Sequence, residues 1–575
     1  MTRISTGCVS SSSRFALCFA LFSLACPISI AQVVMGTSPQ GTFRSNVRQL
    51  PVSGPYAISG TVVDSVSGEA IRRAQVSLHG GAQQNAVLSD ASGHFSFENL
   101  PSGMYVLAAA RPGYFNKRSA ALTLRLGDQA LGEQSPGSVK LILVPASTIE
   151  GNIKNAQGEP LEGIAVSALR SRVQNGSRIW AHAGSAQSDE DGHYRMARLE
   201  PGTYILQTSS RLEHPMVPMK DSEQKGYRGV YFPTAPDQAS ATRIRLDPGQ
   251  QMRADFELAL EPVYRVSGIA PVGEMAVSIQ ATDSAGNSVG TVGFSAGNSD
   301  NGGFEIQNLP AGSYELHVDA YPPAAPGQNH LTATMPITVG PSRTGLVFAL
   351  HPSTSIPIEA HVEGSGPPID NMIEMNAMSS VRLVSQSGGQ VISPSFAAPN
   401  DKPEAVLHEV PPGKYSAELE WFAPCQISGK QVSRGVYASS LRIGSVDLMH
   451  EPLVVPDAGL ADPIELVLKD DGAAISVSLD KAEPNGAVSL VVVPEGSNAQ
   501  PSVRPFYAAA GESSVCGFAP GEYTIAAIKN NGEEIEYKNP EVLRSLLTNA
   551  VHVSLSPSRV TSVRLNLVES VGDGQ

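Results

Sequence analysis

Residues 93–105 read GHFSFENLPSGMY, and this stretch contains the pattern that decides the fold. Phe95 and Phe97 alternate with polar residues, which predicts a strand with one buried face. The segment LPSGMY then predicts a tight turn, because proline presets φ for a turn and glycine accepts a positive φ. Tyr105 starts the next strand, with a ring to bury and a hydroxyl to satisfy. The stretch therefore predicts two strands joined by a corner.

This corner occurs five times in the chain, and every copy contains Gly-x-Tyr. The glycines are separated by 99, 110, 101 and 108 residues, which corresponds to one small domain per repeat rather than to a solenoid. The corner resembles the tyrosine corner of β-sandwiches, so we expect a structural role for it. The paired residues are Gly103 and Tyr105, Gly202 and Tyr204, Gly312 and Tyr314, Gly413 and Tyr415, and Gly521 and Tyr523.

Many short alternating segments bounded by Gly and Pro turns predict an all-β chain, a tandem array of about five antiparallel β-sandwich modules. One short helix is predicted near 540–550, with Asn539 as N-cap and Pro540 in its first turn. We expect sandwich 1 at 55–147, sandwich 2 with loop insertions at 148–262, sandwich 3 at 263–352, sandwich 4 at 353–470 and sandwich 5 at 471–568. A signal peptide at 1–31, a linker at 32–54 and a tail at 569–575 complete the division.

The first residues have the pattern of an export signal. Arg3 and Arg14 precede an apolar run at 15–25, and a small-x-Ala pattern ends at Ala31, after which we expect cleavage. The run is too short for a stable membrane span, and no later stretch is long enough. We therefore expect a secreted, periplasmic or cell-surface protein, with a lipid anchor at Cys26 as the minor alternative.

Charge and cysteine content narrow the possible partners and cross-links. The 575 residues include 40 Lys and Arg against 54 Asp and Glu, without basic clusters, which argues against nucleic acid as a partner. Cys425 and Cys516 are the cysteines beyond the leader. They lie 91 residues apart in different expected sandwiches, so two separate buried thiols are favoured over a disulfide.

The run from Gly60 to Tyr105 resembles the carboxypeptidase regulatory-like domain, a transthyretin-like or prealbumin-like sandwich. Sandwich 2 repeats the run from Gly151 to Tyr204, and later modules keep mainly its second half. The resemblance implies an exported bacterial protein built from such modules. It also implies a carbohydrate-binding-like fold and hence a glycan hypothesis, although function depends on sites rather than on folds.

No catalytic, metal or cofactor site is expected. A zinc carboxypeptidase needs a His-x-x-Glu pair, and none of the 12 histidines is followed by Glu at the third position. His94 and His193 are interpreted as turn residues, and Asp189 and Asp191 as an Asx turn rather than a calcium site. Ser295 lies in GFSAG, which matches a nucleophile elbow, but a predicted loop follows where a helix is required.

We therefore expect a noncatalytic binding or scaffold protein, with a polysaccharide or a cell-surface protein as partner. Sugars bind to exposed aromatic faces, so the carbohydrate-binding candidates are Trp180, Tyr231 and Trp421, with core or interface packing as the alternative for each. The insertions at 171–188 and 212–227 are the expected functional loops. Several weak sites on one chain would act by avidity. The alternatives are a structural stalk, a protein adhesin, or a hydrolase in sandwich 3.

Overall fold

The computed structural model describes residues 54–568, except 81–82, 117–121, 127–137, 214–223, 273–274, 284–287, 296–301, 323–329, 341–342, 365–370, 387–390, 397–404, 420, 422–424, 481–486, 497–499, 508–512 and 530–533. The predicted signal peptide, the linker up to residue 53 and the tail lie outside the described residues.

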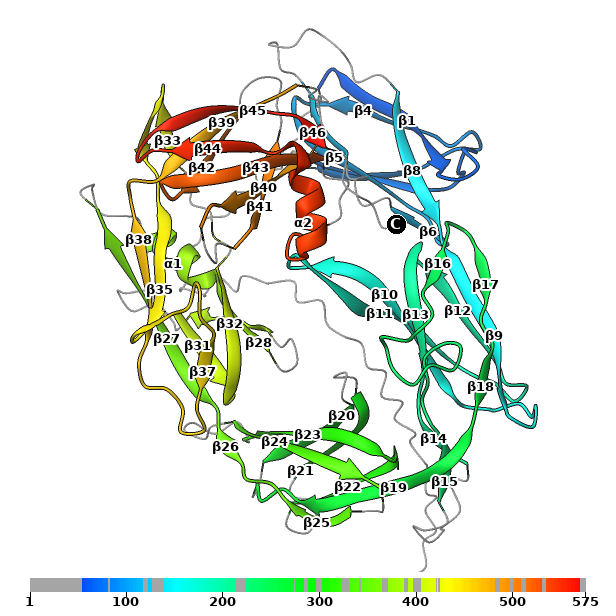
Figure 1. The fold of residues 1–575 in the computed structure, drawn as a ribbon. Coiled ribbons are helices and arrows are strands. Elements are labelled where there is room, and N and C mark those ends of the chain that lie inside the picture. The colour runs from blue at the N-terminus through cyan, green and yellow to red at the C-terminus, as the bar shows by residue number, and fades with distance from the viewer. Residues whose placement is uncertain are drawn as a thin grey trace, which may run out of the picture. The chain divides into compact units, whose positions relative to one another are not determined.

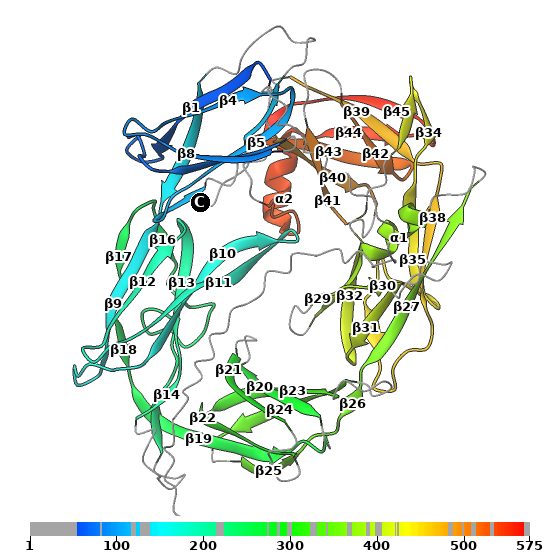
Figure 2. The same ribbon diagram turned by 180° about the vertical axis from the view of Figure 1, so that it is seen from behind.

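The described chain forms β-sandwiches, each with two layers of strands (Figures 1 and 2). The five largest clusters of buried apolar side chains each draw on one sandwich. They lie within residues 58–143, 149–258, 266–348, 356–468 and 473–565. The alternation along each strand places these side chains between the layers.

Sandwiches 1 and 2 share one plan. In sandwich 1 the first sheet has the order β4 (His94–Leu100), β1 (Tyr56–Asp64), β8 (Val139–Pro145), β6 (Tyr114–Asn116), and the second has the order β3 (Gln83–Leu88), β2 (Gln75–Gly80), β5 (Gly103–Ala110), β7 (Leu122–Leu126). In sandwich 2 the first sheet joins β12 (His193–Leu199), β9 (Ser147–Asn155), β17 (Gln251–Arg253) and β18 (Phe256–Leu258), and the second has the order β11 (Ser177–Gln187), β10 (Ala165–Gln174), β13 (Gly202–Thr208), β16 (Ile244–Leu246).

Sandwich 3 keeps this plan and accepts two strands from the preceding segment. Its first sheet joins β14 (Arg211–Leu212), β15 (Lys225–Tyr227), β19 (Leu260–Ile269), β22 (Gly303–Pro310) and β25 (Arg343–Val347). Its second sheet has the order β21 (Ser288–Ser295), β20 (Ala276–Asp283), β23 (Gly312–Tyr321), β24 (Leu331–Val339), β26 (His351–Pro352).

Sandwiches 4 and 5 add helices to the plan. In sandwich 4 the first sheet has the order β30 (Ser395–Phe396), β31 (Ala405–Val410), β27 (Thr354–Glu363), β38 (Ile464–Lys469), β35 (Tyr437–Ile443), β36 (Val446–Asp447). The second sheet has the order β29 (Val391–Ile392), β28 (Val381–Ser385), β32 (Gly413–Leu419), β37 (Leu453–Val455). The module also contains the hairpin of β33 (Gln426–Ser428) and β34 (Gln431–Arg434) and the helix α1 (Asn371–Ser379). Sandwich 5 has the sheet β42 (Ser513–Phe518), β39 (Ala473–Leu479), β45 (Val560–Leu565), and the sheet β41 (Ser502–Tyr507), β40 (Ala487–Pro494), β43 (Gly521–Lys529), β44 (Val551–Leu555), with β46 (Leu567–Val568) beside β43. Its helices are α2 (Pro540–Leu546) and the 3₁₀ turn η4 (Leu547–Asn549).

The sandwiches are built mainly from antiparallel pairs, as expected, and each module also contains parallel pairing. In every module the first strand pairs in parallel with a strand near the module's end: β1 with β8, β9 with β17 and β18, β19 with β25, β27 with β38, and β39 with β45. Parallel neighbours need a long crossover, and here the crossover passes through the opposite sheet. A local alternation pattern contains no information about this pairing.

The five corners share one hydrogen bond. In each corner the tyrosine hydroxyl donates to the carbonyl oxygen four residues earlier, at 2.5–2.9 Å. Burial raises the pKa of all five tyrosines. Gly103, Gly202, Gly413 and Gly521 have φ of 149–156°, in the range that favours glycine.

Two helices lie on the sandwiches. In α2 the Asn539 side chain accepts from the Glu541 N–H at 3.0 Å, and Pro540 occupies the first turn, as the sequence predicts. Its Leu546 packs with side chains of β40 and β43, beside which α2 lies in both views (Figures 1 and 2). Helix α1 was not predicted, because its buried side chains are only Ala377 and Met378 and it lacks a broad apolar face.

Candidate functional site

The structure does not bring the three predicted aromatic candidates together. Trp180 lies half-buried on β11, opposite Ser171 of β10. Tyr231 is 2% exposed and lies between Val230 and Phe232, which pack against the core of sandwich 2. Its ring therefore offers no face to a sugar, which corrects the prediction of a platform at this position. Trp421 follows β32, packs against the core of sandwich 4 and lines a pocket.

The predicted insertion at 171–188 forms most of the hairpin β10–β11, whose tip contacts sandwich 5. The Asn175 N–H donates to the Glu534 carboxylate at 2.8 Å, and the Lys538 N–H donates to the Gly176 carbonyl oxygen at 2.9 Å. Arg178 forms an ion pair with Glu536 at 2.8 Å. This hairpin therefore serves packing between sandwiches, in addition to carrying Trp180.

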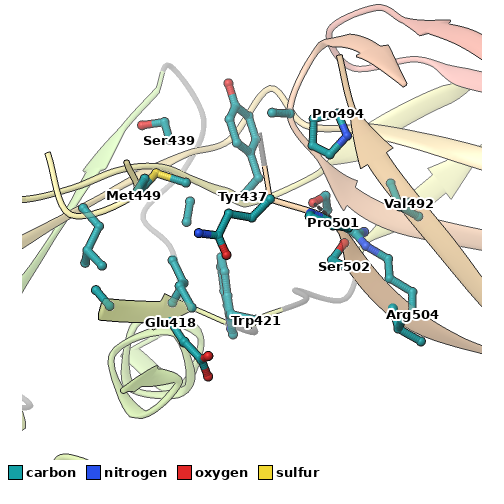
Figure 3. A pocket seen from close by; sticks show the side chains of 18 of the residues that line it. Glu418, Trp421, Tyr437, Ser439, Met449, Val492, Pro494, Pro501, Ser502 and Arg504 are labelled. Atoms are coloured by element: carbon teal, nitrogen blue, oxygen red, sulfur yellow. Dashed lines mark hydrogen bonds between the residues drawn. The ribbon is translucent and has the colours of Figure 1, made fainter. Parts of the chain in front are cut away.

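The pocket that contains Trp421 has a volume of about 580 Å³ and is lined by residues of sandwiches 4 and 5. Glu418, Trp421 and Met449 line it from sandwich 4, while Val492 and Arg504 line it from sandwich 5, as Figure 3 shows. Strand β32 positions Glu418, and strands β40 and β41 position Val492 and Arg504. The pocket therefore exists only where two modules meet.

A disulfide joins the two sandwiches beside this pocket. Cys425, just before β33, is bonded to Cys516 on β42, with 5.8 Å between the Cα atoms. This corrects the preference for two separate thiols. Sequence separation alone argued against the bond, because only the packing of sandwich 4 on sandwich 5 brings the two residues together. A cross-link over 91 residues removes conformational entropy from the unfolded chain.

Arg504, on β41 in the pocket wall, forms hydrogen bonds to β42, the strand that contains Cys516. Its guanidinium donates to the carbonyl oxygens of Cys516 and Gly517 at 2.6 and 3.2 Å. It also lies 3.8 Å from the centroid of the Phe518 ring, within cation–π range. Burial lowers the pKa of Arg504 to about 10, so the group remains charged at neutral pH. The wall is thus held rigidly by backbone and ring contacts.

Glu418 places a buried carboxylate in the pocket wall. Glu418 Oε1 is ion-paired with Lys538 of sandwich 5. Glu418 Oε2 is buried and has no hydrogen-bond partner among the described residues. A buried acceptor without a donor is costly, so a ligand hydroxyl at this position would be stabilising.

Tyr437 also lines this pocket. Burial and the neighbouring Asp471 carboxylate raise the pKa of Tyr437 to about 12. The phenol is therefore protonated at neutral pH. The combination of Trp421, Tyr437 and the Glu418 carboxylate offers apolar ring surface beside polar hydrogen-bonding groups.

The residues considered for catalysis are explained by turn structure. Asp189 accepts from the backbone N–H groups of Asp191 and His193 at 3.1 and 2.8 Å, which is the bonding of an Asx turn. Asp90 accepts in the same way from His94 N–H at 2.8 Å. Hydrogen bonds from Ser92 and His94 lower the pKa of Asp90. Ser295 ends β21, and the segment after it lies outside the described residues.

Among the described residues, no cluster of three or more His, Cys, Asp or Glu residues is arranged to hold a metal ion. None of the helices formed by these residues has the length and hydropathy to cross a membrane.

Comparison with known proteins places sandwich 1 in a family. Residues 57–131 match the family model of the carboxypeptidase regulatory-like domain, which confirms the resemblance seen in the sequence. No curated protein matches the chain.

Several solved structures are similar to parts of the chain. The Bacillus anthracis TIE protein is 12% identical with a TM-score of 0.16, and the match covers 51% of this chain and 50% of that protein. The minor pilin GBS52 of Streptococcus agalactiae is 15% identical with a TM-score of 0.20, over 36% of this chain and 97% of the pilin. The major pilin subunit BcpA of Bacillus cereus is 11% identical with a TM-score of 0.14, over 51% of this chain and 99% of the pilin.

Sequence reasoning selected Trp421 but missed the residues that surround it. The sequence contains no motif at Tyr437, Arg504 or Lys538, which belong to strands and loops of two different modules. No short motif connects them, because the pocket is created by contacts between residues up to 120 positions apart.

Proposed function

We propose that this chain is a noncatalytic, exported scaffold and binding protein that holds a polysaccharide segment in the pocket between sandwiches 4 and 5. The observation that carries the proposal is the presence in one pocket wall of the Trp421 ring and the buried Glu418 Oε2, which has no hydrogen-bond partner among the described residues. A sugar presents a C–H face that packs on an aromatic ring and hydroxyls that donate to carboxylates. One bound residue could satisfy both groups at once.

The rigidity of the pocket supports binding without catalysis. The Cys425–Cys516 disulfide and the Lys538–Glu418 ion pair both connect the two sandwiches beside it. A preorganised cleft loses little entropy when a ligand binds.

The disulfide also supports an exported location, because disulfides persist mainly in oxidising compartments. This agrees with the signal peptide proposed for residues 1–31 and with a secreted, periplasmic or cell-surface protein. Attachment through a lipid at Cys26 remains the alternative, and mass analysis of the exported chain distinguishes it from cleavage after Ala31.

The test is a binding screen of the full chain, expressed with its leader, against a panel of soluble glycans and cell-wall polysaccharides. We expect saturable binding that Trp421→Ala weakens by about tenfold or more, because an aromatic platform contributes on the order of 1 kcal/mol beyond its burial. Trp421→Phe keeps a ring and should retain part of the affinity. Trp180→Ala, on the β10–β11 hairpin, tests the other predicted tryptophan, and loss of binding in this variant alone would place the site on the hairpin instead.

The circular dichroism of each variant must match that of the parent chain, because Trp421 also packs on the core of sandwich 4. Equal binding by Trp421→Ala and the parent would contradict this site. Absence of binding to every glycan would leave a structural stalk or a protein adhesin as the function to pursue.

A further inference from the structure

A second group of acidic, imidazole and aromatic side chains lies on the outer face of sandwich 3. Along β23 the residues Tyr314, Leu316, Val318 and Ala320 point into the core and are buried. The intervening residues are therefore on the opposite face of the strand. These are Glu315, His317, Asp319 and Tyr321.

The neighbouring strands extend this face with small polar side chains. His317 is aligned with Gln280 of β20 and with Thr334 of β24, and Asp319 is aligned with Thr332 of β24. The Thr334 hydroxyl lies 3.3 Å from His317 Nδ1, and the Thr282 hydroxyl lies 3.2 Å from His317 Nε2. The face thus carries carboxylates, an imidazole, hydroxyls and an amide in one patch.

The Tyr321 ring is held in place by an imidazole. The rings of Tyr321 and His330 are stacked, with centroids 4.6 Å apart and planes 16° apart, and the Tyr321 side chain remains 46% exposed. His330 Nε2 lies 3.3 Å from an oxygen of the Asp319 carboxylate. Tyr321 is therefore an oriented aromatic surface rather than a freely rotating side chain.

His330 places a buried polar group in the wall of a cavity. It is 6% exposed, and its Nδ1 has no hydrogen-bond partner among the described residues, whereas Nε2 faces the Asp319 carboxylate at 3.3 Å outside hydrogen-bond geometry. It lines a cavity of about 890 Å³, together with Tyr321, Asp319 and His317 of sandwich 3 and with His408 and Glu409 of sandwich 4. A buried imidazole whose Nδ1 has no hydrogen-bond partner among the described residues is destabilising unless a polar group enters the cavity.

We infer that this cavity, formed by the outer face of β20, β23 and β24 and completed by sandwich 4, is a second binding site that takes a neutral saccharide. The hydroxyls of a sugar both donate and accept, which suits a mixture of carboxylates, imidazoles and threonine hydroxyls. Its C–H face suits the Tyr321 ring. The carboxylates Glu315 and Asp319 disfavour an anionic ligand. The site shares no residue with the Trp421 pocket, so it does not rest on the proposed function.

The experiment uses the full chain and neutral hexasaccharides of cellulose, xylan, mannan, laminarin and chitin as probes. Affinity is measured by calorimetry for the parent chain, Tyr321→Ala, Trp421→Ala and the double variant. In parallel, nitration of Tyr321 is followed by mass spectrometry with and without each probe. We expect at least one probe to protect Tyr321 from nitration, and Tyr321→Ala to weaken its binding by about tenfold or more.

Two further variants separate loss of contact from loss of structure. Tyr321→Phe keeps the ring and should retain most of the affinity, whereas Asp319→Asn keeps the shape and should weaken binding. Met104→Ala changes another exposed side chain, in sandwich 1, and should leave affinity unchanged.

The outcomes distinguish this site from the Trp421 pocket. Binding that survives Trp421→Ala but is lost in Tyr321→Ala supports the site in sandwich 3. Binding that is lost in Trp421→Ala, with unchanged affinity in Tyr321→Ala and no protection of Tyr321, overturns the inference and leaves the proposed function intact. If no probe binds and none protects Tyr321, the saccharide assignment is wrong for both sites.

Discussion

At the scale of single residues, the position just before each corner has an unusual backbone. Asn99, Arg198, Asn308, Glu409 and Gly517 have φ between 55° and 77°. In each module the strand pairing shifts register beside this residue, as in a β-bulge. The bulge turns the strand into the corner, and its left-handed residue carries a side chain in four of the five modules. This repeated feature was not predicted, because the residue type varies from module to module.

Substitution of Arg198 tests the bulge. Arg198 is exposed and has φ of 61°, so its side chain makes the left-handed conformation unfavourable without adding core packing. Arg198→Gly should leave stability unchanged or raise it by up to about 1 kcal/mol, since glycine accepts this φ. Arg198→Val should lower stability by about 1–2 kcal/mol, because a β-branched residue is disfavoured there. Urea unfolding of both variants checks the order, and a valine variant as stable as the glycine variant would contradict it.

At the scale of elements, the hairpin β10–β11 connects sandwich 2 to sandwich 5 through its tip. Part of this contact is between backbone groups, because the Lys538 N–H donates a hydrogen bond to the Gly176 carbonyl oxygen. Tyr537 packs so closely on Gly176 that a Cβ at this position would collide with its ring. The hairpin therefore requires glycine at its tip for the contact as well as for its φ of 75°.

A double-mutant cycle on Arg178 and Glu536 measures this connection. The side chains are 40% and 10% exposed and lie 2.8 Å apart, so we expect a coupling free energy of about 0.5–1 kcal/mol between Arg178→Ala and Glu536→Ala. The coupling should decrease at high salt. The pair Arg195 and Glu150, within sandwich 2 and 3.6 Å apart, serves as the exposed control with a smaller coupling. Zero coupling for Arg178 and Glu536 in low salt would mean that the hairpin does not dock in solution.

At the scale of the whole molecule, the five corner tyrosines should together lower the free energy of unfolding at alkaline pH. Burial raises the pKa of Tyr204 and Tyr415 to about 12, against an ordinary value of 10.0. The other three corner tyrosines are raised for the same reason. Above pH of about 10 the unfolded chain loses these protons while the folded chain keeps them. The folded state is therefore destabilised as pH rises through this window, whereas below it the tyrosines cause no pH dependence.

We expect the urea midpoint to fall steadily between pH of about 10 and 12 and to be insensitive to these groups near pH 8. Tyr204→Phe removes one such group and one hydrogen bond. It should lower stability at pH 8 by about 1 kcal/mol and make the alkaline loss less steep. A parallel alkaline loss in parent and variant would show that the corner tyrosines do not control it.

The sequence by itself determined what depends on near neighbours. The five corners, the alternation of the strands, the Asx turn at Asp189 and the cap of α2 at Asn539 involve residues within a few positions of one another. Their residue types restrict the backbone directly. The burial of one strand face follows from alternation alone, so the all-β sandwich class could be derived from the sequence as well.

Only the tertiary structure decided what depends on packing between distant segments. The parallel pairing of first and last strands, the Cys425–Cys516 disulfide, the burial of Tyr231 and both cavities arise from such contacts. The proposals for Glu418 and His330 could not be made beforehand, because the lack of a hydrogen-bond partner among the described residues is a property of the surroundings and not of the residue. Local preferences select strands and turns, whereas the docking of modules decides which polar groups are buried together, and that docking has no short sequence pattern.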